Sequence, residues 1–386
     1  MSHYLRLYRV ISTTFGFRVR PLGAFLLLQV RQGISATTMG LDHLFYPRLR
    51  KQPIDRPIFI IGNPRSGTTF LHRLLLGAGG MAAFELWEML FPAITARKLL
   101  GRIVPRLDRL SPARYHPSDV HDTNLRGIET DDVAWFFRTL DGPFAWAYFL
   151  AWQDKWGSAL SRRTFGIEGV TERDRERFFR YYEACWRRNL TYKRSGRILA
   201  KTSMLTFRLD EVLQRYPDAK LVYIIRDPVE VIPSGMSLIS AVLENGYDVW
   251  NRTSTDDQEQ WIENLYQASC AMLGTFYEAQ TSGRIPERNL CVVRYTDLLE
   301  NLEPTIARIV DFLEIEPTAA FLDEVREQAE RQRNYTSSHK HAPDQFGLDP
   351  ARIRRDLGYV YDAYGLPGPP AATEIPAAAE TRTGSQ

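Results

Sequence analysis

The chain has 386 residues, of which 44% are hydrophobic and 25% are charged, a composition typical of a globular protein. The formal net charge of +3 is too small to indicate a nucleic-acid-binding protein. No apolar run reaches the roughly 18 residues of a membrane-spanning helix. The three cysteines show neither metal-ligand spacing nor a disulfide framework, which favours a cytoplasmic protein without a metal site.

The first 51 residues are basic, with eight Arg and Lys residues against a single acidic residue, Asp42. Apolar side chains recur there near helical spacing, at Tyr4, Leu7, Tyr8, Ile11 and Phe15. Two interpretations stay open. The helix either packs on the protein with its arginines in water, or lies on an anionic membrane surface as a peripheral contact.

The stretch PIFIIGNPRSGTT, residues 57–69, predicts a buried strand, a tight turn and the start of a helix. It keeps both glycines and the final hydroxyl residue of the phosphate-loop pattern, but Thr68 stands where that pattern has lysine. A cation appears inside the loop instead, as Arg65. Backbone N–H groups at a helix N-terminus bind anions. Because the lysine that contacts the β- and γ-phosphates of a triphosphate is missing, the loop is better suited to a single small phosphate.

The rest of the chain alternates strands and helices, which implies a parallel sheet covered by helices. We expect a mainly helical, aromatic-rich region up to about Tyr192, then a helix over 207–217. Further strands are expected at 221–225 and 290–295, with a helix around 304–312. The fold class is therefore α/β. We expect a basic helical extension at 1–51, one domain at 52–365 and a disordered Pro/Ala-rich tail at 366–386.

A second motif accompanies the loop. The segment IIRDPVEVIPSGMSL places Arg226 at the end of a predicted strand and Ser234 eight residues later. With PRSGTT, it resembles the sulfotransferases that use 3′-phosphoadenosine 5′-phosphosulfate (PAPS), most closely their bacterial and tyrosylprotein branches. The resemblance extends over roughly residues 57–364 and implies a P-loop-like sulfotransferase fold.

The resemblance assigns residues to the two ends of PAPS. The 5′-phosphosulfate would be held by the loop, and the 3′-phosphate by Arg226 and Ser234. Tyr295, in VVRYTDLLEN, would lie near the adenine or else pack in the core. Ser338 and Lys340 would close over the cofactor or else lie in a solvated loop. The loop residues implied are Arg65, Ser66, Gly67, Thr68 and Thr69.

Lys201, in AKTSML, resembles a lysine placed against the transferred group, but Ser203 follows where cytosolic members have a catalytic histidine. The general base must then come from elsewhere. Our candidates are, in order, Glu88, Glu129 and His121, and Glu129 starts an acidic cluster with Asp131 and Asp132. Glu85 is a weaker rival of Glu88. Further histidines that have a suitable pKa are His72, which is better suited to packing, His116, His339 and His341. Either glutamate could instead be structural, Glu88 as a solvated charge and Glu129 at a helix N-terminus.

The acceptor is expected to be a hydroxyl or amine on an unidentified, apolar or lipid-like molecule. Between positions 135 and 156 lie nine aromatic residues, and Tyr148, Trp152 and Trp156 are spaced as on one helix face. These side chains would form either core packing or the wall of an acceptor pocket. The alternatives to a sulfotransferase are a P-loop nucleotide kinase or hydrolase, which Thr68 disfavours, and a nucleotide-binding protein without catalysis.

Overall fold

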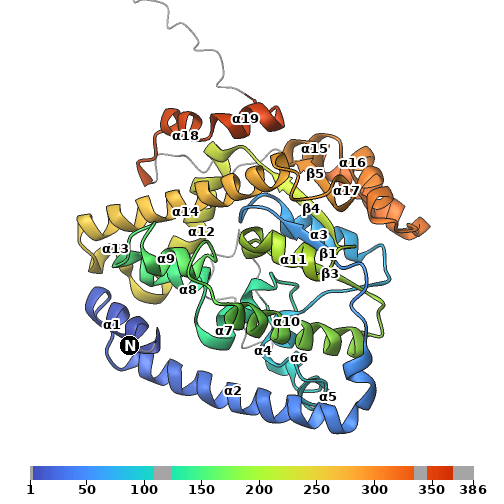
Figure 1. The fold of residues 1–386 in the computed structure, drawn as a ribbon, viewed down its shortest axis with the longest axis horizontal. Helices are drawn as coiled ribbons and strands as arrows, with labels where there is room; N and C mark the ends of the chain where they lie inside the picture. The colour runs from blue at the N-terminus through green and yellow to red at the C-terminus, as the bar shows by residue number, and fades with distance from the viewer. Residues whose placement is uncertain (1–2, 108–123, 334–345, 368–386) are drawn as a thin grey trace, which may run out of the picture.

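The computed structural model describes residues 3–107, 124–333 and 346–367. Their core is a sheet of five parallel strands in the order β2-β3-β1-β4-β5, with β1 at its centre (Figure 1). The strands are β1 (Ile58–Ile61), β2 (Met81–Ala82), β3 (Arg197–Lys201), β4 (Lys220–Ile225) and β5 (Leu290–Arg294). The predicted strands at 58–61, 221–225 and 290–295 correspond to β1, β4 and β5, whereas β2 and β3 were not predicted.

Helices surround this sheet on both faces (Figure 1). The first half of the chain contains α1 (His3–Thr14), α2 (Arg20–Phe45), η1 (Pro47–Lys51), α3 (Thr68–Leu76), α4 (Leu86–Leu90), α5 (Ile94–Leu100), α6 (Val104–Leu107), α7 (Asp132–Thr139), α8 (Pro143–Tyr148), η4 (Leu150–Trp152), α9 (Ala159–Thr164) and α10 (Glu172–Lys193). The second half contains η5 (Met204–Arg208), α11 (Leu209–Arg215), α12 (Pro228–Tyr247), α13 (Val249–Arg252), α14 (Thr255–Thr281), η6 (Glu287–Asn289), α15 (Tyr295–Glu300), α16 (Leu302–Leu313), α17 (Ala319–Arg333), α18 (Pro350–Asp356) and α19 (Gly358–Tyr364).

The strands are buried on both faces because alternate side chains enter two separate cores. Phe59 and Tyr223 belong to the core that includes residues of α1, α8, α10, α12 and α14. Ile58, Ile60 and Val222 belong to the core formed with α3, α15, α16 and α17. The result is a three-layer α/β architecture in which all carboxyl ends of the strands lie at one edge of the sheet.

The N-terminal helices pack onto this architecture through specific contacts. Leu7, Ile11 and Phe15 are buried, and the Phe15 ring lies edge-on to Trp152 with centroids 5.5 Å apart. The apolar face predicted for the first helix therefore packs on the protein. None of the helices in the described parts of the chain is both long and apolar enough to cross a membrane.

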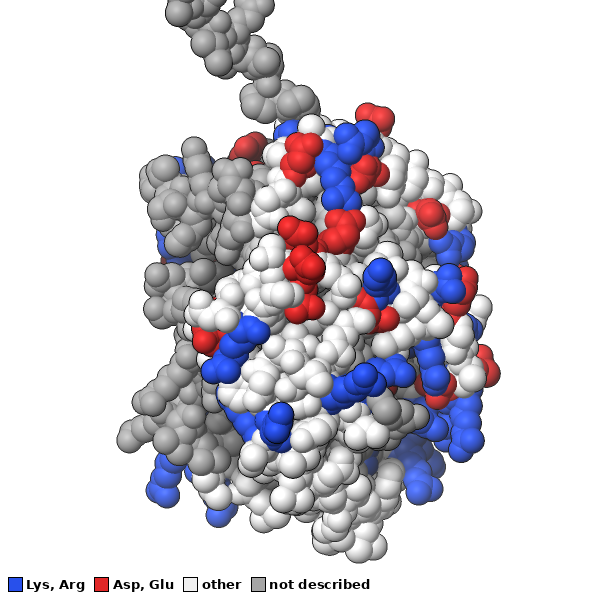
Figure 2. Space-filling model, turned by 90° about the vertical axis from the view of Figure 1, so that its left-hand side faces the viewer, with Lys and Arg blue, Asp and Glu red and all other residues white. Residues whose placement is uncertain are grey.

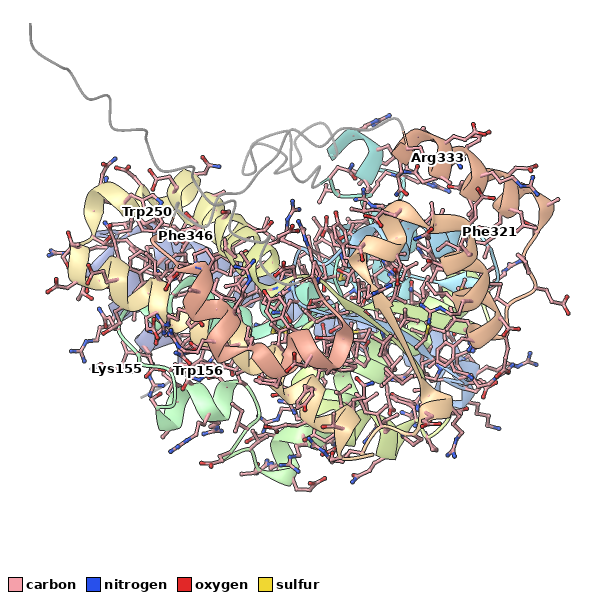
Figure 3. The ribbon with its side chains drawn as sticks, turned by 90° about the horizontal axis from the view of Figure 1, so that it is seen from above. Lys155, Trp156, Trp250, Phe321, Arg333 and Phe346 are labelled. Atoms are coloured by element: carbon pink, nitrogen blue, oxygen red, sulfur yellow. The ribbon has the colours of Figure 1, made fainter. Side chains whose placement is uncertain are left out.

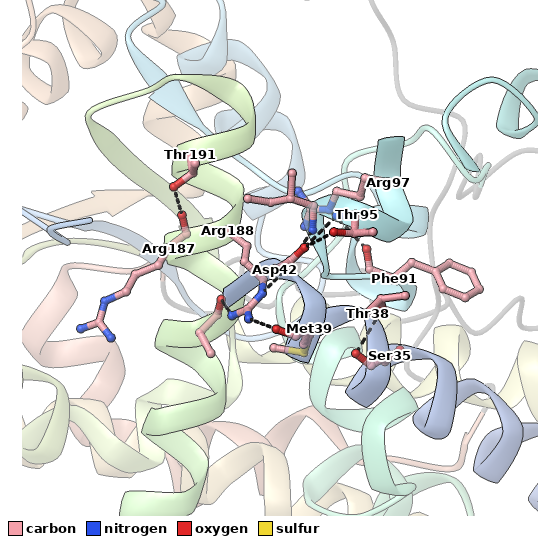
Figure 4. A network of polar contacts seen from close by, with 12 residues as sticks. Ser35, Thr38, Met39, Asp42, Phe91, Thr95, Arg97, Arg187, Arg188 and Thr191 are labelled. Atoms are coloured by element: carbon pink, nitrogen blue, oxygen red, sulfur yellow. Dashed lines mark hydrogen bonds and ion pairs between the residues drawn. The ribbon is translucent and has the colours of Figure 1, made fainter. Parts of the chain in front are cut away.

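Asp42 fixes α2 in place (Figure 4). Its carboxylate is fully buried and accepts hydrogen bonds from the backbone N–H groups of Ile94 (2.9 Å) and Thr95 (2.8 Å), at the start of α5. The Nε of Arg188, on α10, lies 2.8 Å from the same carboxylate. One acidic side chain thus joins three helices, and its charge is satisfied within the protein.

The segment 346–367 returns to α13. Phe346 and Trp250 lie close together in Figure 3, with ring centroids 6.4 Å apart. The chain between Arg333 and Phe346, both labelled in that view, carries Ser338, Lys340, His339 and His341, which lie outside the described residues. His116 and His121 and most of the expected C-terminal tail also lie outside them.

Candidate functional site

The phosphate-like loop follows β1 and requires both of its glycines. Gly62 has a φ of 148°, and a Cβ there would lie 2.6 Å from the carbonyl oxygen of Ile224. Gly67 caps α3 with a φ of 90°, and a Cβ there would lie 2.9 Å from Cδ2 of Tyr295. A side chain at Gly62 would clash with the backbone of β4, and one at Gly67 with the ring of Tyr295. The loop therefore packs closely against the ends of β4 and β5, and α3 begins where the loop ends, so that its N-terminal N–H groups lie at the loop.

Arg65 and Arg226 meet beside this loop. Arg226 follows β4, and its Nη1 donates to the carbonyl oxygen of Arg65 at 2.8 Å. The Nε of Arg65 donates to Oγ of Ser234 at 3.3 Å, and Ser234 is buried on α12. Arg65 itself has a φ of 75°, the left-handed region that non-glycine residues rarely adopt. The two motifs recognised in the sequence are thus in direct contact.

Tyr295 completes this group at the end of β5. The guanidinium carbon of Arg226 lies 4.4 Å from the centroid of its ring, which stabilises both side chains by a cation–π contact. Burial lowers the pKa of Arg65, and the neighbouring Arg226 charge lowers it further. The two cations repel each other, and Glu230, whose carboxylate pairs with Arg226 at 2.9 Å, offsets only one of the two charges. The arrangement is therefore suited to a phosphate group.

Lys201 lies on the other side of the loop, at the end of β3. It is buried, and its Nζ donates to Oγ1 of Thr69 at 2.8 Å. Burial lowers the pKa of this ammonium, while the carboxylate of Glu129 raises it. The loop, Lys201, Arg226 and Tyr295 thus follow four different strands and meet at the carboxyl edge of the sheet. Ligands in such folds bind at this edge, where the strand order reverses.

The acidic segment lies directly against Lys201. The backbone N–H of Asp131 donates to the Lys201 carbonyl oxygen at 2.8 Å, and Thr130 Oγ1 donates to the same oxygen at 3.1 Å. Burial raises the pKa of Glu129, which Lys201 and Arg73 partly offset. The Oε1 of Glu129 is buried and makes no hydrogen bond with the described residues. Glu129 therefore combines a raised pKa with an oxygen free to accept a proton.

Asp131 and Asp132 have structural partners. Asp132, at the start of α7, accepts hydrogen bonds from Oγ1 of Thr202 at 2.5 Å and from the backbone N–H of Ser203 at 2.8 Å. The hydroxyl of Tyr182 donates to Asp131 at 3.3 Å, and burial raises the pKa of Asp131 well above its ordinary value. These aspartates hold the Glu129 segment against the end of β3.

Glu88 lies in a different environment. Its Oε2 accepts the backbone N–H of Glu85 at 2.8 Å, which closes a capping box at the start of α4. The same oxygen lies 2.9 Å from Nζ of Lys193, and Oε1 lies 3.8 Å from Nη1 of the fully buried Arg97. Both carboxylate oxygens of Glu88 therefore contact groups that stabilise the fold. Glu85, the weaker rival, accepts a hydrogen bond from Trp87 Nε1 at 2.8 Å.

We expect the Glu88→Gln variant to be destabilised by about 3–5 kcal/mol, because the buried Arg97 loses its carboxylate partner. Chemical denaturation followed by circular dichroism would measure this change. Glu300→Gln, at an exposed glutamate at the end of α15, is the matched control and should leave the free energy of unfolding nearly unchanged. Equal stability of the two variants would contradict a structural role for Glu88.

Two further residues differ from catalytic expectations. His72 is fully buried on α3, and one ring nitrogen lies 2.9 Å from the Leu199 carbonyl oxygen. Burial lowers its pKa to about 3, so it is neutral and orients α3 against β3. Ser203, at the position of the missing histidine, is buried beside Asp132. Neither side chain has the properties of a general base near pH 7.

The helix predicted through Tyr148, Trp152 and Trp156 does not form, so that prediction was wrong. The helix α8 ends at Tyr148, and Trp152 lies on η4, where it is fully buried and stacks on Trp261 with centroids 5.2 Å apart. Trp152 is therefore core. Half-buried rings at Phe136, Phe144 and Tyr148 contact one another at the edge of this core, with centroids 6.0–6.3 Å apart, on the two helices after the acidic segment.

Sequence reasoning missed two charged neighbours of the site. Glu230 pairs with Arg226 at 2.9 Å, one helical turn further along the chain, a spacing that could have indicated the pair. Arg73 lies one turn after Thr69 on α3, and its positive charge lowers the pKa of Glu129. The two residues are far apart in the chain, so no local sequence pattern predicts this interaction. Within the described ranges, no group of three or more His, Cys, Asp or Glu side chains could hold a metal ion.

Comparison with known proteins gives one family. The sequence pattern of the Sulfotransferase family matches residues 57–319. Omega-hydroxy-beta-dihydromenaquinone-9 sulfotransferase Stf3 of Mycobacterium bovis is 24% identical over 318 residues, which cover 81% of this chain and 75% of the relative. The protein of that name from Mycobacterium tuberculosis matches to the same extent.

Solved structures agree on the fold. Sulfotransferase STF9 from Mycobacterium avium superposes with a TM-score of 0.64 at 15% identity, covering 84% of this chain and 81% of its own. Sulfotransferase STF1 from Mycobacterium tuberculosis H37Rv gives a TM-score of 0.62 at 18% identity, and the match covers 92% of this chain and 91% of STF1. These similarities confirm the predicted α/β fold of the P-loop-like sulfotransferase type.

Proposed function

This chain belongs to the sulfotransferase family, and from that premise we propose that it transfers the sulfuryl group of PAPS to a hydroxyl group of an apolar, lipid-like acceptor. The observation that carries the proposal is the meeting of two cationic groups around one loop. Arg65, Arg226 and Ser234 lie on one side of Gly67, and Lys201 bonds Thr69 on the other. A donor with a phosphate at each end of its ribose fits this pair of sites.

The donor would be oriented by its two phosphates. The 3′-phosphate would lie against Arg226 and Ser234, with the adenine near Tyr295. The 5′-phosphosulfate would lie on the loop, held by backbone N–H groups and by the hydroxyls of Thr68 and Thr69. Ser338 and Lys340, which the resemblance also assigns to the donor, lie outside the described residues.

Transfer would occur by in-line displacement. The acceptor oxygen forms a bond to sulfur as the bond from sulfur to the 5′-phosphate oxygen breaks, and that phosphate leaves with the electron pair. Lys201, which lies at Thr69, would stabilise the charge that develops on the bridging oxygen, together with Arg65. This step needs no metal ion, because the fixed cations supply the positive charge.

Glu129 would remove the acceptor proton. We propose it in place of Glu88, because Glu129 lies in the segment bound to Lys201 and keeps a buried oxygen that no described residue hydrogen-bonds. The carboxylate of Glu88 is instead held by Arg97 and Lys193. A raised pKa brings Glu129 closer to the range where a carboxylate is an effective base.

The acceptor proposal has two supports. The half-buried rings of Phe136, Phe144 and Tyr148 follow Glu129 and Asp132 directly in the chain and could form an apolar wall beside the reacting hydroxyl. The curated relatives are named as sulfotransferases of a hydroxylated menaquinone, which is a lipid-like alcohol.

All three cysteines are unpaired, and we place the protein in a reducing compartment such as the cytoplasm.

The test is transfer between two molecules that differ in one group. The protein is incubated with PAPS and a long-chain isoprenoid alcohol, or with the methyl ether of the same alcohol, and the product is followed by mass spectrometry. We expect a sulfate ester from the alcohol and none from the ether, because the ether has no proton to lose. Phosphorylation of the alcohol from Mg-ATP, or no turnover of PAPS with apolar alcohols, would overturn the proposal.

A further inference from the structure

The helix α2 presents an apolar face that no described part of the protein covers. One side of α2 packs inward at positions seven residues apart: Pro21, Leu28, Ser35 and Asp42. The opposite side exposes large apolar side chains, which we call the α2 ridge: Leu22, Leu26, Leu27, Val30, Ile34, Leu41, Leu44 and Phe45. Leu27 is 70% exposed and Leu44 is 72% exposed. Successive members are one, three, four or seven residues apart, so all of them lie on the same side of the helix, with a gap between Ile34 and Leu41.

The α2 ridge has a basic border. Exposed cations precede and follow it, at Arg9, Arg18, Arg20, Arg48, Arg50 and Lys51. Over residues 3–51 the single carboxylate is that of Asp42, and it is buried against Arg188 and the start of α5. All exposed charged side chains of this segment are therefore cationic, and they lie beside exposed apolar side chains.

The neighbouring helix extends the same pattern. The start of α5 is bound to Asp42 of α2, and the segment 91–107 contains no acidic residue. It exposes Leu99 and Ile103 beside the cations of Lys98, Arg102 and Arg106. In Figure 2 the lowest part of the molecule, where α2 lies in Figure 1, shows white and blue surface but no red among the described residues.

We propose that the α2 ridge docks this protein on the surface of an anionic lipid bilayer, with α2 parallel to the membrane plane. Its apolar side chains would enter the boundary between headgroups and acyl chains, and the bordering cations would contact lipid phosphates. At about 1.5 Å per residue, α2 offers a contact roughly 40 Å long. The proposal does not depend on sulfuryl transfer, since docking is measured without donor or acceptor.

The charge pattern favours a bilayer over a second copy of this chain. A symmetric dimer through the α2 ridge would place the same patch on both partners, so its basic borders would face each other. No acidic side chain in residues 3–51 or 91–107 is exposed to compensate that repulsion. The surface that we propose also differs from the face that the sequence indicated, because the apolar side of α1 is buried within the protein.

Vesicle co-sedimentation tests the proposal with the full chain. We expect the wild type to bind vesicles of phosphatidylglycerol and phosphatidylcholine, to bind less as salt is raised, and to bind pure phosphatidylcholine weakly. The variant Leu26→Glu/Leu27→Glu should bind at least about tenfold more weakly, since it replaces two inserted side chains by charges. Because both side chains are exposed, the thermal melting curve should stay that of the wild type.

The matched control carries the same two substitutions outside the ridge, at the exposed Ile167 and Leu299. Ile167→Glu/Leu299→Glu should lose much less binding than the ridge variant. A second variant, Arg48→Glu/Arg50→Glu, should weaken binding to anionic vesicles and reduce its salt dependence. Equal binding by the ridge variant and the control would overturn the proposal. So would a wild-type dimer in light scattering that the ridge substitutions convert to a monomer without any vesicle binding.

Discussion

Replacing Glu129 by glutamine should lower kcat for sulfuryl transfer by about 10²–10⁴-fold, the usual contribution of a general base. The substitution keeps the size of the side chain and removes its ability to accept a proton. The Glu129 segment is held to β3 by backbone and hydroxyl hydrogen bonds from Asp131 and Thr130, which the change leaves in place. Steady-state kinetics with PAPS and an apolar alcohol would measure the loss.

Two controls separate catalysis from folding. Binding of 3′,5′-adenosine bisphosphate should be nearly unchanged in Glu129→Gln, since the donor contacts that we propose lie at the loop, Arg226 and Ser234. Glu88→Gln should show the opposite behaviour, with reduced stability and a kcat close to wild type when folded. If Glu88→Gln instead lost kcat with full stability, the base would be Glu88 and our assignment would be wrong.

The pH profile gives an independent readout of the same residue. Burial raises the pKa of Glu129 above its ordinary value of 4.5, and the base must be deprotonated to act. The rate should therefore fall as pH is lowered through this raised pKa, at a higher pH than for an exposed glutamate. The acidic limb should disappear in Glu129→Gln. A limb that persists unchanged in this variant would assign the titration to another group.

Replacing Arg226 by alanine should weaken binding of 3′,5′-adenosine bisphosphate by about 10²–10⁴-fold. Hydrogen bonds to charged groups contribute about 1.5–3 kcal/mol each, and Arg226 can offer two to a phosphate. The change also removes the cation over the Tyr295 ring and the hydrogen bond that supports Arg65. Isothermal titration calorimetry would measure the affinity.

Arg294→Ala is the matched control, because Arg294 ends β5 immediately before Tyr295. Its guanidinium is half-exposed and pairs with Asp297 at 2.9 Å instead of the loop. Affinity for the bisphosphate should change less than about threefold, as expected for an exposed ion pair. Similar losses in both variants would mean that Arg226 acts only through general positive charge.

The parts of the fold that the sequence predicted are those with strong local signals. The strands β1, β4 and β5 are runs of large apolar residues buried on both faces, a pattern that has few other interpretations. The strand β3, RILAK, has charged residues at both ends, and β2 has only two residues, so neither produced a signal. Two short motifs also located elements that lie together in the structure: the loop with Arg65 contacts both Arg226 and Ser234, although the resemblance had assigned them to opposite ends of the donor.

What the sequence could not predict depends on contacts between distant segments. The four-residue spacing of Tyr148, Trp152 and Trp156 favours a helix, but the chain turns there. Trp146 donates to Asp154, and Asn264 on α14 donates to the carbonyl oxygens of Ala151 and Asp154. Such tertiary hydrogen bonds outweigh local propensity.

The ranking of the two glutamates depended on contacts of the same kind. Lys193 and Arg97 form ion pairs with the Glu88 carboxylate. Lys201, which contacts the segment that contains Glu129, lies about seventy residues after it in the chain. The positions of these cations follow from the sheet order and from α10, and no spacing between the residues in the chain reveals them.

The most direct test of the account is calorimetric titration of the wild type with 3′,5′-adenosine bisphosphate and, separately, with Mg-ATP. The loop has a threonine in place of the lysine that triphosphate chemistry requires, and ATP lacks the 3′-phosphate that we propose Arg226 and Ser234 bind. We expect tight binding of the bisphosphate and much weaker binding of Mg-ATP. Preference for Mg-ATP would contradict the account and return the loop to nucleotide kinase or hydrolase chemistry.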